Sequence, residues 1–168
     1  EPREVPVVEF VTGNHQNVLR KGELLRSIRL TASALSKRYA MRQMSLTHLG
    51  RSAALIVGTA EKEGSNFLLT ITASTPRPVQ LRFANMPSAD ELRHAINEQL
   101  PADGYFQDVH GSARYKRHLT YYFSEQIRVE ILMGETTLAA FLIGAATEFE
   151  DVHYVCQGIE WTDDKPVL

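Results

Sequence analysis

The sequence has one cysteine and no long apolar run. Cys156 is the only thiol among 168 residues, which excludes an intrachain disulfide framework and a multi-thiolate metal site and indicates a reducing compartment. We therefore expect a cytoplasmic protein. The longest apolar run, residues 136–146, is much shorter than the roughly 20 residues of a transmembrane helix, and no charged-then-apolar leader opens the chain. We expect a soluble protein without membrane contact.

An excess of charge is also missing, since 18 Lys and Arg face 20 Asp and Glu, for a formal net charge of −2. This balance excludes the large basic field that drives non-specific nucleic-acid binding, so we expect no nucleic-acid partner. The motifs of dinucleotide-binding, P-loop, serine hydrolase and zinc protease sites are absent, so no catalytic residue can be named. The chain opens at Glu1 without a methionine, and we expect it to be a piece of a longer protein.

The first third of the chain indicates extended structure. Residues 5–11 are rich in β-branched side chains, but Pro6 cannot donate a ladder hydrogen bond, which predicts at best an edge strand or the entry to a strand. Residues 12–14 are typical of a turn. Residues 24–30 favour another short strand.

The pattern is clearer from residue 53 onward. Residues 53–59 and 67–73 are apolar runs of strand length, and the polar segment 61–66 between them predicts a hairpin. Residues 79–83 alternate apolar and polar side chains. The economical interpretation is three consecutive antiparallel strands.

The second half predicts helices, beginning with one that Pro101 ends. Ser88 and Glu91 have the spacing of a capping box, and the apolar side chains of Leu92, Ile96 and Leu100 then recur every four residues.

A second helix follows, with Ser112 as its N-cap and Gly134 at its end. Residues 127–132 also alternate like a strand, which leaves a second interpretation open for that stretch. The apolar face of the predicted helix comprises Tyr115, Leu119, Tyr122, Phe123 and Ile127.

Periodicity alone predicts a third helix over residues 137–149 and a strand over residues 152–161. A sheet-forming half followed by helices is an α+β arrangement, with the helices packed on one face of an antiparallel sheet.

Histidines and acidic residues offer few metal ligands. His48 and His94 are isolated, and lone histidines are more often packed or surface side chains than ligands. Asp108, His110 and His118 are the densest set, but the helical rise places the two histidines roughly 9–12 Å apart, too far for one ion. We expect no metal site.

Two further candidates have a functional and a structural interpretation. The basic stretch Arg114, Lys116, Arg117 and His118 could contact phosphate, but a solvated polar helix face is favoured because no aromatic platform accompanies it. Cys156 could be a nucleophile, but nothing beside it supplies a base, which favours a small buried side chain.

Several segments, in order, resemble the FAD-binding subunit or middle domain of molybdenum hydroxylases, the xanthine dehydrogenase and carbon monoxide dehydrogenase group. Residues 5–13 (VPVVEFVTG) and 19–28 (LRKGELLRSI) are similar to the passage that closes the family's flavin domain. Residues 39–57 stand where the family has a strand, a variable turn and a second strand. Residues 108–119 (DVHGSARYKRHL) resemble the start of a family helix and are the most specific match.

The resemblance implies a fold and a function. It implies that residues 1–33 are the C-terminal edge of an FAD-binding domain, and that residues 34–133 are a C-terminal domain with a three-stranded antiparallel sheet and a helix bundle. Residues 134–168 have no family counterpart and form an additional helix and tail. The family passes electrons from iron–sulfur clusters, fed by a molybdenum centre, through FAD to an acceptor. The implied partners are molybdopterin-binding and iron–sulfur subunits or domains.

The resemblance names one cofactor-binding position, Leu25, whose family counterpart packs near the flavin; a plain strand leucine is the alternative. Two other positions near the flavin depart from the family pattern, because Met41 replaces a lysine and Ser45 replaces an arginine. The glycine-rich loops that hold the pyrophosphate in the family are also missing. We therefore expect FAD in the full-length protein and an absent or incomplete FAD site, without activity, in this piece. The alternative is a diverged, non-catalytic interaction module without flavin.

Overall fold

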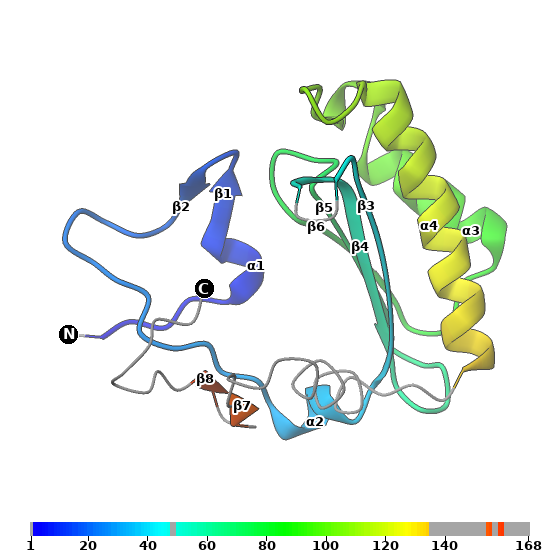
Figure 1. Ribbon diagram of the computed structural model, residues 1–168. Helices are drawn as coiled ribbons and strands as arrows, with labels where there is room; N and C mark the ends of the chain where they lie inside the picture. Colours follow the sequence, from blue (N-terminus) through cyan, green and yellow to red (C-terminus); the bar gives the residue numbers. More distant parts are fainter. Residues whose placement is uncertain (1, 48–49, 135–153, 156–157, 160–168) are drawn as a thin grey trace.

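A computed structural model describes residues 2–47, 50–134, 154–155 and 158–159. The α+β class is confirmed: a four-stranded antiparallel sheet in the order β3-β4-β5-β6 has α3 and α4 on one face (Figure 1). These elements are β3 (Arg38–Ser45), β4 (Ser52–Ala60), β5 (Phe67–Thr72), β6 (Val79–Phe83), α3 (Ala89–Gln99) and α4 (Ala113–Met133). We call residues 38–134 the sheet–helix unit.

The three-stranded sheet predicted from the sequence is wrong by one strand. The three expected strands are β4, β5 and β6, and β3 pairs antiparallel with β4 along its whole length. The apolar pattern does not indicate β3 because two arginines, Arg38 and Arg42, occupy positions on its helix-facing side. Arg42 lies opposite Ile56, and instead of entering the core its guanidinium donates to Gln126 and pairs with Glu130 on α4.

The core lies between the sheet and the two helices. Gly58 permits the closest approach, because a Cβ at this position would overlap Ile127 Cγ2 and lie 2.8 Å from Ile131 Cδ1 of α4. The largest fully buried apolar side chains of the core are Phe67, Ile56, Leu69, Ile71, Leu92, Ile96, Ile127 and Ile131.

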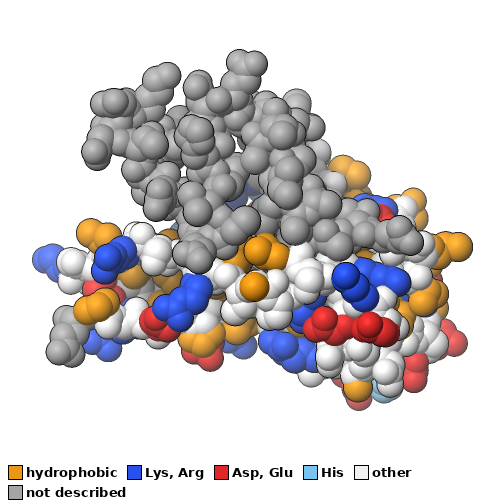
Figure 2. All heavy atoms as spheres, turned by 90° about the horizontal axis from the view of Figure 1, so that it is seen from below, with side chains coloured by type: hydrophobic (Ala, Val, Ile, Leu, Met, Phe, Trp, Pro, Cys, Tyr) orange, Lys and Arg blue, Asp and Glu red, His pale blue; other side chains and the backbone are white. Residues whose placement is uncertain are grey.

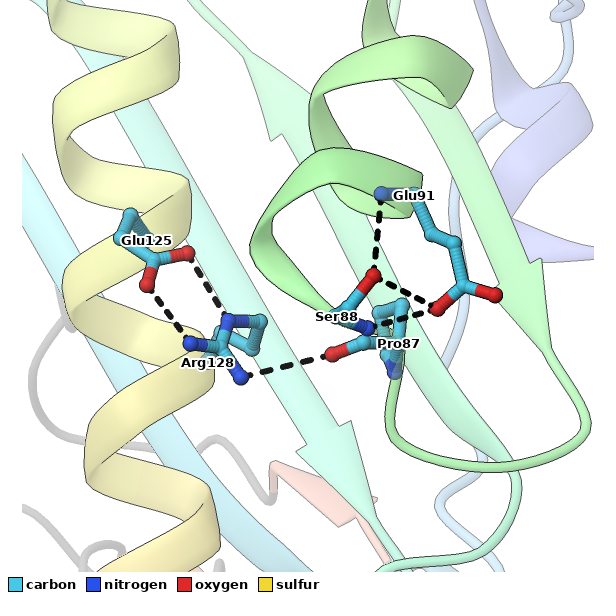
Figure 3. Close-up of polar contacts among 5 residues, drawn as sticks. All are labelled: Pro87, Ser88, Glu91, Glu125 and Arg128. Carbon is cyan, nitrogen blue, oxygen red and sulfur yellow. Dashed lines mark hydrogen bonds and ion pairs between the residues drawn. The ribbon is translucent and has the colours of Figure 1, made fainter.

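The capping box of α3 is confirmed, and the residue before it, Pro87, is bonded to α4 (Figure 3). The Ser88 hydroxyl accepts from the Glu91 amide, and the Glu91 carboxylate accepts from the Ser88 amide at 2.8 Å. From α4, Arg128 donates to both carboxylate oxygens of Glu125 and, at 3.4 Å, to the Pro87 carbonyl. The start of α3 is thereby tied to the middle of α4.

Helix α4 begins after its predicted cap, Ser112, and includes residues 127–132, which settles the open choice there in favour of helix. Two members of the predicted apolar face are not buried: Tyr115 is 38% and Tyr122 is 53% exposed. The two tyrosines lie beside the buried face of α4, because Lys116 and Thr120 are buried there instead.

The N-terminal segment, residues 2–33, differs from the prediction. Within residues 5–11, Pro6 is the N-cap of a short helix, α1 (Val7–Phe10), and only the last residue belongs to a strand, β1 (Val11–Gly13), as in a strand entry. A proline suits the start of a helix because the amide it lacks would have no helical partner there. The turn predicted over residues 12–14 lies at residues 14–15, between β1 and β2 (Gln16–Asn17). Residues 24–30, predicted as a strand, are irregular and pair with no strand among the described residues. The short helix α2 (Ala32–Leu35) leads into β3.

Short elements lie outside the four-stranded sheet and its two helices. A 3₁₀ turn, η1 (Ala102–Gly104), follows α3. In place of the single strand predicted over residues 152–161, β7 (Tyr154–Val155) pairs with β8 (Gly158–Ile159). The helix predicted over residues 137–149 and Cys156 lie outside the described residues.

The described part of the chain contains no helix long and apolar enough to span a bilayer. Acidic, basic and apolar side chains are interspersed on the face of the molecule seen in Figure 2.

Candidate functional site

The structure does not bring together the three positions that the resemblance places near a flavin. Leu25 lies in the irregular segment between β2 and α2 and is 51% exposed. Met41 lies opposite Val57 on β3 and is half-buried; the next residue, Arg42, points to α4, so Met41 faces the side of the sheet away from the helices. Ser45 follows a register shift at the end of β3 and donates to the Thr47 carbonyl at 2.7 Å.

Two hollows stand out among the described residues. The larger, about 630 Å³, is an open groove along the outer side of α4 that includes Tyr122 and Val129. Both of its carboxylates already have ionic partners, because Arg42 pairs with Glu130 and Glu125 pairs with Arg128. The groove is therefore an open surface with paired carboxylates and an exposed aromatic side chain, that of Tyr122.

The smaller hollow, about 190 Å³, lies where the N-terminal segment meets the sheet–helix unit. We call it the junction hollow. His15 of the β1–β2 turn, Arg51 before β4, Arg77 after β5 and Asp108 of the loop before α4 contribute to its wall. Neither hollow is lined by Leu25, Met41 or Ser45. The described residues thus do not enclose a flavin by themselves.

The loop before α4 is held by a buried ion pair that the sequence did not reveal. The Lys116 side chain is fully buried, its Nζ lies 2.9 Å from Asp108 Oδ1, and the ammonium also lies 5.2 Å from the centre of the Phe106 ring. The ion pair lacks the directed geometry of a hydrogen bond. The preference for a solvated polar face at residues 114–118 is therefore wrong for Lys116, which faces inward because its carboxylate partner lies in the loop.

Electrostatics at Asp108 follow from this pair. Burial acts to raise the pKa of Asp108, but Lys116 and the His110 amide, which donates to Oδ1 at 2.8 Å, outweigh burial and lower it. Asp108 is therefore a carboxylate at neutral pH and neutralises the buried ammonium.

The densest set of possible metal ligands, which the sequence analysis rejected as a metal site, is divided between two places. Asp108 accepts from His110, whereas His118 stacks on Tyr122 with ring centres 6.2 Å apart. No group of three potential metal ligands occurs within the described ranges. His94 is exposed and lies 3.3 Å from Glu98, and His48 is outside the described residues.

An aromatic platform does accompany the basic stretch of α4, contrary to the sequence interpretation. The guanidinium groups of Arg93 and Arg117 lie 5.0 Å and 5.6 Å from the centre of the Tyr121 ring. Arg117 donates to the Tyr121 hydroxyl, which in turn donates to Asn97 of α3. These contacts occupy the ring, so the platform joins α3 to α4.

Helix α4 also has a buried polar stripe that was not predicted from the sequence. Lys116, Thr120 and Ser124 recur every fourth residue and are buried, and the Thr120 hydroxyl lies 3.3 Å from that of Ser74 on the sheet side. Burial, aided by Tyr121, raises the pKa of the neighbouring Tyr105 to about 12. The four-residue spacing of these polar side chains is the signal that could have revealed the stripe.

Comparisons with known proteins give one informative match. No family model matches the chain, and no curated protein is similar to it in sequence. Its fold is similar to that of a chain in the crystal structure of quinoline 2-oxidoreductase from Pseudomonas putida 86, with a TM-score of 0.58 and 15% sequence identity. The match covers 79% of this chain and 49% of that chain, so this chain spans about half the length of its structural neighbour. At this identity the similarity shows a shared fold.

Proposed function

We propose that this chain is part of the FAD-binding subunit of a molybdenum-hydroxylase-type oxidoreductase, which relays electrons from iron–sulfur clusters through FAD to an acceptor. The fold similarity to a chain of quinoline 2-oxidoreductase is the observation that carries the proposal. The ordered sequence matches that end in residues 108–119 support it independently.

The division of the chain is part of the same proposal. Residues 1–33 would be the edge of the flavin-binding domain and residues 34–133 its C-terminal domain, with residues 134–168 as an addition. The contrast in burial supports this division, because neither α1 nor α2, the short helix that crosses the boundary, buries a residue, whereas residues 38–134 have a core of their own. Molybdopterin-binding and iron–sulfur subunits or domains would be the partners.

In this proposal Leu25 contacts a flavin that is held mainly by other parts of the full-length protein. Its half-exposed side chain is available for such a contact. FAD would supply the redox chemistry, and this chain would supply an apolar surface.

The test is FAD binding to the full-length protein, measured by visible absorbance and by titration of the flavin-free form. We expect a flavin-coloured protein and, for Leu25→Glu, an affinity for FAD at least about tenfold lower, because the added carboxylate must lose its hydration against an apolar ring. Leu24→Glu is the matched control, because Leu24 is the adjacent leucine and is 78% exposed. Equal affinities of the two variants would refute the role of Leu25.

The second candidate is a non-catalytic interaction module, favoured by Met41 and Ser45 at the positions where the family has basic residues. A colourless full-length protein that takes up no added FAD, and whose upstream sequence lacks glycine-rich loops, would support this candidate and overturn the first.

A further inference from the structure

The junction hollow carries positive charge that no described carboxylate neutralises. Neither Arg51 nor Arg77 takes part in any ion pair found within the described ranges. Asp108, the carboxylate in the wall, already neutralises Lys116 behind it. Arg51 Nη1 lies 3.4 Å from His15 Nε2, so the N-terminal segment adds a basic ring to the same place.

The backbone of the junction hollow is strained at Ala73, which has φ 64° and lines the hollow. The other described non-glycine residues with positive φ, His15 and Asn66, belong to residue types that adopt this conformation more readily. For alanine the left-handed conformation is unfavourable, and such strain is concentrated at functional sites.

The size of the junction hollow limits what it can hold. At about 190 Å³ it is smaller than the roughly 300–1,000 Å³ of pockets for whole drug-sized ligands. It therefore suits one compact group of a ligand or a small ion. Guanidinium groups match the oxygen geometry of phosphate and carboxylate, to which they donate in pairs.

From charge, strain and size together, we propose that the junction hollow binds the phosphate group of a small ligand, held by Arg51 and Arg77 with His15 beside them. Because His15 belongs to the N-terminal segment and both arginines to the sheet–helix unit, the bound anion stabilises the contact between these parts. The proposal does not depend on the proposed function, since its residues include none of the flavin positions.

Isothermal titration of the chain with inorganic phosphate tests this site directly, with thermal shift as the second readout, since a ligand of the folded state raises the melting temperature. We expect saturable binding that weakens with added salt and falls at least about tenfold in Arg51→Gln and in Arg77→Gln, because each substitution removes charge-assisted hydrogen bonds to the anion. Arg82→Gln is the matched control, because Arg82 is an exposed arginine outside the hollow that donates to Gln80. These exposed positions allow the variants to fold, which circular dichroism checks.

Two further arms identify the source of the phosphate. Binding of FMN tighter than phosphate, with the same loss in Arg51→Gln, would support the site and assign it to a nucleotide; equal binding of both would support the site for free phosphate. Riboflavin binding as tight as FMN would overturn the proposal, because riboflavin has no phosphate. Absence of saturable phosphate and FMN binding, or equal losses in Arg82→Gln, would overturn it as well. None of these outcomes bears on FAD uptake by the full-length protein.

Discussion

The N-terminal segment and the sheet–helix unit both contain apolar side chains but are built in opposite ways. In the sheet–helix unit, apolar side chains of four strands and two helices meet in one core. In the N-terminal segment, Leu24, Leu25, Ile28 and Leu30 remain exposed. Polar contacts hold that segment instead: Arg3 donates to Glu23 and, with the Arg20 amide, lowers the pKa of Glu23 to about 2.

This contrast shows that apolar content alone does not make a folding unit. The N-terminal strands are three and two residues long and, among the described residues, pair only with each other. A two-stranded hairpin is marginally stable in water. The sheet–helix unit has four strands and a covering layer, so each buried side chain has partners. Truncating an apolar side chain should therefore lower the free energy of unfolding strongly in the sheet–helix unit and little in the N-terminal segment.

The largest expected effect compares two leucines. Leu69→Ala should lower the free energy of unfolding by about 3 kcal/mol, because it leaves a cavity in a packed core; Leu69 is fully buried. Leu25→Ala should change it by less than about 0.5 kcal/mol, since half of that side chain is already exposed. Urea unfolding followed by circular dichroism measures both. Similar losses would show that the N-terminal segment shares the core.

The buried ion pair gives the next effect. Asp108→Ala should cost about 3 kcal/mol because it leaves the Lys116 ammonium buried without a counter-charge. Lys116→Met should cost less, about 1 kcal/mol, because it removes the buried charge and keeps the apolar stem. Denaturant unfolding measures the loss of unfolding free energy in both variants. A larger loss in Lys116→Met than in Asp108→Ala would contradict the prediction.

The same pair predicts a pH dependence. The folded pKa of Asp108 is lowered, so the stability it contributes is complete above the ordinary Asp pKa of about 3.9 and is lost as the pH falls through the folded value. The stability gap between wild type and Asp108→Ala should therefore narrow below about pH 4. A gap that widens on acidification would contradict the pairing.

A smaller effect tests the closest approach of helix and sheet. Gly58→Ala should cost about 1–3 kcal/mol, because the new methyl group meets Ile127 and Ile131 and overpacking displaces α4. Gly104→Ala is the control, because its Cβ would make ordinary contacts at 3.6 Å with Leu100 and Pro101. Melting temperatures compare the two, and an unchanged value for Gly58→Ala would refute the close approach.

The smallest effect concerns the cap of α3. Ser88→Ala should cost about 1 kcal/mol at neutral pH, whereas Ser27→Ala in the N-terminal segment should be neutral. Hydrogen bonds from the Ser88 amide and hydroxyl lower the pKa of Glu91 against weak opposition from burial. The contribution of the box is therefore present above the ordinary Glu pKa and is lost as the pH falls through the folded value. Thermal unfolding against pH should show a shallower acid dependence in Ser88→Ala.

Most of the sheet–helix unit could be predicted from the sequence, because its signals are local. The β4–β5 hairpin, the Ser88 box and the Ser112 cap depend on residues within one turn or strand of each other. Strand β3 could not be recognised from its pattern, because Arg42 occupies a core-facing place and its partners are more than 80 residues away. The resemblance did place a strand there, from residue 39.

The candidate sites could be predicted from the sequence less completely than the fold. The sequence singled out Asp108 and Lys116 separately, in a rejected set of possible metal ligands and in a solvated basic stretch, and only folding made them a buried pair. The junction hollow assembles His15, Arg51 and Arg77 from three separate connections, and no spacing in the sequence relates them.

The sequence by itself determined the α+β class, the order of hairpin and capped helices and the even balance of charge, because alternation, capping and composition act between near neighbours. Tertiary structure alone decided that β3 completes the sheet, that Lys116 faces inward and that Leu25 stays exposed. Burial depends on which distant surface a side chain meets, and in the N-terminal segment the described residues provide no such surface for Leu25.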